Sequence, residues 1–203
     1  MSMSSPPEIN ASSMADIGFL LLIFFLVTTT LEVDLGIQKR LPNKEAIGQV
    51  FTTENNTLEI LINNKNEIMV DGVVITDLME LKKMAIDFID NGAGLDAKGN
   101  PCTWCNGNKN SQSSDHPKKA IVKLLASRDA NYDLYIKVQN TISSAYNSLR
   151  NRLALTMHND SFTNLKISFK KNQNDDKLES YINAIEAKYP IQIVETTYRN
   201  IPQ

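Results

Sequence analysis

The sequence has few of the residues that build metal, redox and catalytic centres. Among 203 residues it has two cysteines and two histidines. Two cysteines cannot form a disulfide framework, and a structural zinc site needs four ligands. His116 could be a third ligand beside Cys102 and Cys105, but no residue supplies a fourth. We therefore expect no metal site, and "PCTWC" is interpreted as loop thiols, a local disulfide in an oxidising compartment, or a redox pair.

Motifs for common catalytic and phosphate-binding sites are also missing. The sequence contains no glycine-rich phosphate loop, no nucleophile elbow and no acidic cluster with metal-ligand spacing. His116 and His158 both stand outside any motif. A formal net charge of -2 leaves no basic footprint for nucleic acid. We expect a protein that is not an enzyme, needs no cofactor and does not bind nucleic acid.

Long apolar runs are scarce too, and the sequence has one, over residues 14–31, with a single charged residue, Asp16. Eighteen helical residues span roughly 27 Å, close to the hydrocarbon thickness of a bilayer. A signal peptide is disfavoured because residues 1–10 lack Lys and Arg and no small-x-small cleavage site follows. A buried core helix is disfavoured because residues 19–27 are apolar on every face. The run predicts a transmembrane helix over residues 13–33.

Asp16 is the unusual residue of this run. A charged carboxylate near a bilayer is costly, so it tends to face other protein and to carry function. Helical spacing places Leu20, Ile23, Val27 and Thr30 on its face, which offers one hydroxyl group at the far end. A proton path along this face would need partner helices from other chains. The alternative is that Asp16 lies at the headgroup level and caps the helix, and the residues alone leave both interpretations open.

The charges near the run do not settle its orientation. Lys39 and Arg40 follow the span and would place the following domain in the cytoplasm. A long folded domain can nevertheless be translocated largely regardless of charge. Composition alone therefore leaves the topology open.

Residues 8–30, "EINASSMADIGFLLLIFFLVTTT", resemble the start of the ExbD/TolR biopolymer-transport proteins. Glu8, Ile9, Asn10 and Asp16 match the family's acidic-apolar-Asn tripeptide and the Asp that opens its single membrane helix. Ser13 departs from the pattern, since the family usually has a proline there. The tail also lacks the family's usual basic residues.

Weaker matches follow the helix. "RLPN", residues 40–43, resembles the Leu-Pro that leads into the family's periplasmic part, and "LEILINNKNEIMVDGVVI" resembles its first hairpin. "YDLYIKVQNTISSAYNSLRNRLA" resembles the long helix of versions from Bacteroidetes-type bacteria. The resemblance covers most of the chain except residues 92–117.

The resemblance implies a proton-driven energy transducer in the inner membrane. It implies a cytoplasmic tail over 1–12, a membrane helix over 13–33, a linker over 34–56 and a periplasmic domain over 57–203. It also implies an ExbB-type multi-span partner, a TonB-type partner and a homodimer, with Asp16 as the proton carrier. Two alternatives stay open: a TolR-like envelope-integrity or motility motor, and a membrane-tethered binding module in which Asp16 has no proton role.

The remaining chain predicts a small α+β domain. Strands are expected over 58–62, 68–70, 73–75, 121–125, 165–169 and 191–193, from alternation and turn signals. Helices are expected over 78–89, with Asp77 and Glu80 in a capping-box arrangement, over 134–153 and over 178–189. The Gly-, Asn- and Ser-rich residues 92–117 predict a surface insertion.

Overall fold

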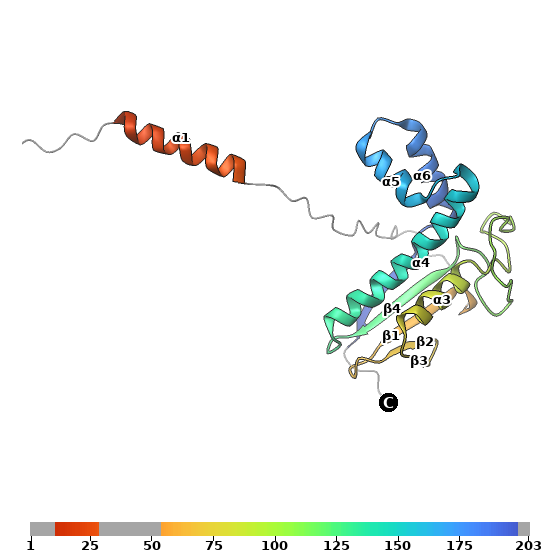
Figure 1. Cartoon of the computed structure of the whole chain (residues 1–203). Coiled ribbons are helices and arrows are strands. Elements are labelled where there is room, and N and C mark those ends of the chain that lie inside the picture. The colour runs from red at the N-terminus through yellow and green to blue at the C-terminus, as the bar shows by residue number, and fades with distance from the viewer. Residues whose placement is uncertain (1–10, 29–53, 199–203) are drawn as a thin grey trace, which may run out of the picture. The chain divides into compact units, whose positions relative to one another are not determined.

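Contacts within the chain divide it into two units, residues 1–41 and 42–203. The computed structural model describes residues 11–28 of the first unit and residues 54–198 of the second (Figure 1). The expected span over 29–33 and most of the expected linker, residues 34–53, lie outside the described residues.

The described part of the first unit is one helix, α1 (Ala11–Thr28). Its large apolar side chains are exposed on all sides of the helix, from Met14 to Val27. This follows from a sequence with no polar stripe after Asp16. Within the described ranges, no helix reaches the length and apolarity required to cross a membrane.

The second unit is built on a mixed five-stranded sheet in the order β3-β2-β1-β4-β5. Its strands are β1 (Thr57–Ile62), β2 (Ile68–Val70), β3 (Val73–Ile75), β4 (Ile121–Ser127) and β5 (Ile193–Tyr198). A short 3-10 helix, η1 (Glu54–Asn56), precedes β1. The pairs β1–β2 and β2–β3 are antiparallel, whereas β4 runs parallel to both β1 and β5.

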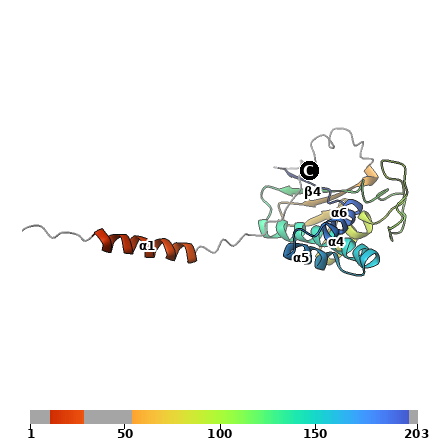
Figure 2. The same cartoon turned by 90° about the horizontal axis from the view of Figure 1, so that it is seen from above.

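The helices of this domain cover one face of the sheet (Figure 2). They are α3 (Leu78–Ile89), α4 (Tyr132–His158), α5 (Phe162–Lys171) and α6 (Asp176–Lys188). In β1 and β4 alternate side chains are buried under the helices, among them Ile60 and Leu124. The opposite face carries the ion pair between Glu59 and Lys123, at 2.8 Å. The expected mixed domain of helices and strands is therefore confirmed.

Polar side chains begin these helices as the local sequence predicts. The Asp77 carboxylate accepts from the backbone N–H of Met79 at 2.8 Å and caps α3. Asn131, Ser161 and Asp175 do the same for α4, α5 and α6. Helix α4 ends at Asn159, whose φ of 55° is the left-handed conformation that asparagine tolerates.

The strand expected over 165–169 is wrong, because these residues belong to α5. The alternation of Leu165, Ile167 and Phe169 is coincidental, since the side chains that α5 buries are Phe162 and Leu165, at helical spacing. Ile167 is exposed. The Ser161 cap gives the helix its start, which outweighs a short apparent alternation.

Two further expectations need correction. The last strand begins at Ile193 and runs to Tyr198, whereas 191–193 was expected. Residues 92–117 do not lie only on the surface, because the side chains of Ser114 and His116 are fully buried. The insertion therefore contributes to the interior of the domain.

Candidate functional site

Asp16 lies inside α1, beyond its first turn. The helix begins at Ala11, and its first turn contains no acidic residue. The backbone N–H groups that need a cap are the first four of a helix, so Asp16 does not cap α1. It is the only charged residue of the helix.

The side chains expected to share a face with Asp16 point away from the helix into open space. Leu20, Ile23 and Val27 are exposed by 60%, 42% and 70%. Thr30, the fourth residue of this face, lies outside the described residues. Within the described part of the chain, no hydrogen bond or ion pair reaches Asp16.

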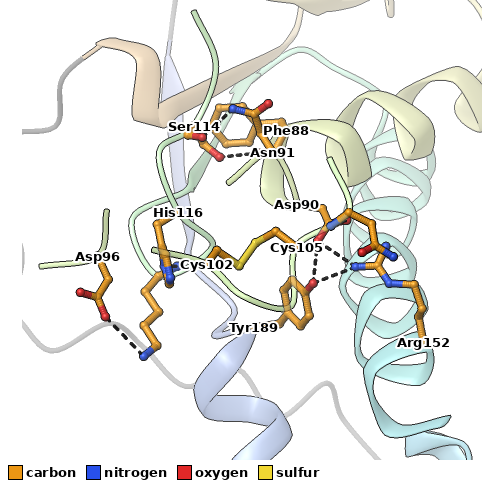
Figure 3. Close-up of a disulfide and its surroundings, with 12 residues drawn as sticks. Phe88, Asp90, Asn91, Asp96, Cys102, Cys105, Ser114, His116, Arg152 and Tyr189 are labelled. Atoms are coloured by element: carbon orange, nitrogen blue, oxygen red, sulfur yellow. Dashed lines mark hydrogen bonds and ion pairs between the residues drawn. A yellow bond between two sulfur atoms is a disulfide. The ribbon is translucent and has the colours of Figure 1, made fainter. Parts of the chain in front are cut away.

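A second group of candidate residues surrounds a disulfide in the 92–117 insertion. Cys102 and Cys105 are bonded, with their Cα atoms 5.6 Å apart and three positions of sequence separation (Figure 3). The bridge packs against the end of α3. A Cβ added at Gly92, which has a φ of +62°, would lie 2.7 Å from the Cβ of Cys105.

Asp90, directly after α3, ties this loop to the rest of the domain. Its Oδ1 accepts from the Tyr189 hydroxyl at 2.6 Å and from the Arg152 guanidinium at 2.8 Å. Its Oδ2 accepts from the backbone N–H of Asn106 at 3.1 Å. One buried carboxylate thus joins α3, the insertion, α4 and the end of α6, as Figure 3 shows. We call Asp90, Arg152 and Tyr189 the Asp90 cluster.

The charges of this region are compensated within the fold. Arg150 is buried, and its Nε and Nη2 both donate to the Tyr189 carbonyl, at 3.0 and 2.8 Å. Burial lowers the pKa of Arg150, and the nearby Glu186 opposes this shift. Burial also raises the pKa of the Tyr189 hydroxyl, helped by its hydrogen bond to Asp90. Fully satisfied groups of this kind hold a structure together and leave no atom free for chemistry.

Asn91 fastens the second half of the insertion. Its amide donates to the carbonyls of Asn110 and Ser114 at 2.8 and 2.7 Å, and its Oδ1 accepts from the Asn110 N–H at 2.8 Å. The Ser114 hydroxyl donates to the Phe88 carbonyl. These bonds give backbone N–H and C=O groups of the loop the partners that a helix or a strand would otherwise provide.

His116 lies in the interior beside Trp104, with ring centroids 5.4 Å apart and perpendicular planes. Its Nδ1 accepts from the Lys118 N–H at 3.1 Å, so the neutral ring carries its proton on Nε2. Burial lowers the pKa of His116, and Asp96 opposes this shift while Lys118 and Lys119 add to it. Among the described residues, no group of three His, Cys, Asp or Glu side chains is placed to hold a metal ion. This histidine is interpreted as a packed core residue.

The structure thus keeps the predicted residues in separate places. Asp16, Leu20, Ile23 and Val27 lie on α1, and the cysteine pair lies in the second unit. Sequence reasoning missed the Asp90 cluster, whose members are 37 to 99 positions apart. The local sequence contains no signal that would have found it.

Comparison with known protein families gives one finding that covers most of the chain. The family described as "Biopolymer transport protein ExbD/TolR" matches residues 3–157. This range includes α1 with Asp16, the first four strands, α3, the insertion and nearly all of α4. The match defines the class as components of biopolymer transport. The chain belongs to the ExbD/TolR family.

Comparison with the curated proteins and with the solved structures gives no match. Helices α5 and α6 and strand β5 follow the range that the family matches.

Proposed function

We propose that the chain is an ExbD-type energy transducer in the inner membrane, in which α1 is the membrane helix and Asp16 carries protons. The observation that supports this most is the carboxyl group of Asp16, which does not cap α1 and has no partner among the described residues, in a helix whose large side chains are otherwise apolar. Family membership supplies the context, because ExbD/TolR proteins serve biopolymer transport. In the described part of the second unit, by contrast, the buried charges of Asp90 and Arg150 are compensated by partners within the fold.

The disulfide supports a periplasmic location for the second unit. Disulfides persist in oxidising compartments such as the periplasm and are rare in the reducing cytosol. Cys102 and Cys105 are bonded in a part of the chain that packs into the domain core. With residues 1–12 in the cytoplasm, α1 then crosses the membrane once.

In the proposed mechanism, Asp16 takes up a proton from the periplasmic side and becomes neutral. The neutral helix moves past the apolar lining of an ExbB-type multi-span partner. The proton is then released towards the cytoplasm. Each charge that moves across 100 mV releases about 2.3 kcal/mol, so several protons per stroke can drive a mechanical change. A homodimer of this chain and a TonB-type protein would pass that change to the outer membrane.

The test replaces Asp16 in a strain that depends on this chain. Asp16→Asn keeps the size of the side chain but cannot ionise, and Asp16→Glu keeps the carboxyl group as the matched control. We expect Asp16→Asn to abolish uptake of a labelled substrate through a TonB-dependent receptor, with expression and copurification of the multi-span partner unchanged. Normal uptake by Asp16→Asn would exclude the mechanism.

Two further results would redirect the proposal. Replacing residues 11–33 with an unrelated apolar span should abolish function, whereas retained function would favour a membrane-tethered binding module. Leakage of periplasmic proteins with intact uptake, in cells that lack the chain, would favour a TolR-like role.

A further inference from the structure

A groove of about 440 Å³ lies where the start of β1, helix α3 and the insertion meet. Its apolar part is formed by Leu58, Met84 and Phe88. Its opposite part comes from the second half of the insertion, with Asn108, Asn110 and other polar side chains. The groove has no role in the function proposed for Asp16.

The insertion side of the groove is held in place by hydrogen bonds to the rest of the domain. The Asn55 amide donates to the Ser111 carbonyl at 3.1 Å. Asn56 and Asp115 exchange two hydrogen bonds, of 2.9 and 2.8 Å, and Asn91 fastens Asn110 as described above. A wall with this many fixed points is preformed, as binding sites usually are.

The charged side chains that line the groove are acidic. Asp71 and Asp87 both line it, and none of the described lysine or arginine side chains does. The Oδ1 of Asp71 accepts from the Glu59 N–H at 3.0 Å, which leaves its Oδ2 for a ligand. Asp87 is exposed, and no described residue forms a hydrogen bond or ion pair with it. The groove therefore disfavours anions and favours a cation.

The rest of the lining selects among cationic ligands. Amide side chains such as Asn108 and Gln112 offer both donors and acceptors, which match the N–H and C=O groups of an extended peptide. The apolar surface of Met84 and Phe88 suits the methylene stem of a lysine, whose ammonium group remains with a carboxylate. A free polyamine would use the carboxylates and leave the amides unmatched.

We propose that this groove binds an extended peptide segment bearing lysine, with the ammonium group paired to Asp71 or Asp87. The charge complementarity of the two carboxylates and the amide-rich wall of the insertion together define this ligand. The site is separate from Asp16, so either proposal can fail without the other.

The test measures binding of fluorescein-labelled tetralysine to the full chain in a nonionic detergent, by fluorescence anisotropy at low salt. The test variant combines Asp71→Asn and Asp87→Asn, which keep the shape of both side chains and the acceptor for the Glu59 N–H. The matched control is Glu80→Gln, which removes an exposed charge from the same helix, seven positions before Asp87 and outside the groove. Labelled tetraglutamate and unlabelled spermine are the ligand controls.

We expect the double variant to weaken tetralysine binding about tenfold, because two partly exposed ion pairs are lost, and Glu80→Gln to change it less than about twofold. Tetraglutamate should not bind, and spermine should compete far less well than unlabelled tetralysine. Equal binding by the double variant and the unaltered chain would overturn the proposal. Competition by spermine as strong as that by tetralysine would show a polyamine site and would also overturn it.

Discussion

Removing one hydroxyl group from the Asp90 cluster should destabilise the whole second unit. Tyr189 is fully buried, and its hydroxyl donates to Asp90 at 2.6 Å and accepts from Arg152 at 2.9 Å. Tyr189→Phe deletes both bonds but leaves the direct contact between Asp90 and Arg152 at 2.8 Å. A hydrogen bond to a charged group contributes roughly 1.5–3 kcal/mol, so we expect a loss of about 2 kcal/mol in the free energy of unfolding.

The assay is denaturant unfolding of the full chain in detergent, followed by circular dichroism and by the fluorescence of Trp104, the only tryptophan. A loss of about 2 kcal/mol corresponds to a melting temperature about 4–8 °C lower for a chain of this size. Tyr181→Phe is the matched control on α6, because among the described residues its hydroxyl has no hydrogen-bond partner. If Tyr189→Phe unfolds at the same denaturant concentration as Tyr181→Phe, the cluster does not stabilise the fold as argued.

Three other predictions use the same unfolding measurement. The double variant Cys102→Ser, Cys105→Ser should lose about 2 kcal/mol in the free energy of unfolding, which is the loop-closure value for a ring of four residues. Reductant should shift the unfolding midpoint of the unaltered chain and leave that of the double variant unchanged. Burial lowers the pKa of His116 below its ordinary 6.5, so the unfolded chain binds the proton more readily and stability falls as the pH drops below 6.5. His116→Gln should remove that part of the acid sensitivity, and an unchanged pH slope would contradict it. Gly107→Ala should cost about 3 kcal/mol, since its Cβ would lie 2.5 Å from backbone atoms after α3. Gly99→Ala should cost only about 1 kcal/mol, because its Cβ meets no atom and the strain comes from its φ of +81° alone.

Local patterns were sufficient to predict most elements of the second unit. The Asp77 cap and the apolar spacing after it predict α3, and the alternation in β1 predicts a strand buried on one side. Asp16 could be found in the same way, because a single charge in an apolar run is a local signal. The strand expected over 165–169 failed because Phe162, Leu165 and Phe169 share one face of a helix, which leaves Ile167 exposed.

The insertion could not be predicted because its order depends on distant partners. Its composition indicates a loop, and it has no regular secondary structure to replace the hydrogen bonds of its backbone. Those bonds are made by Asn91, which follows α3, and by Asn55 and Asn56, which lie in η1 before β1. The sequence of the insertion does not indicate which of its own side chains will be buried. A pattern search therefore assigns the whole segment to the surface.

Within the described residues, the two units differ in how their charged side chains are satisfied, and the proposed function rests on this difference. In the second unit, Asp90, Arg150 and Arg152 find partners within the chain, so their charges are held in one state. A proton carrier needs the opposite condition, since its charged and neutral forms must both be accessible during the cycle. We propose Asp16 for this role, because among the described residues it neither caps the helix nor pairs with a charge. Under that proposal its partners belong to another subunit, and the energetics of the helix depend on the assembly.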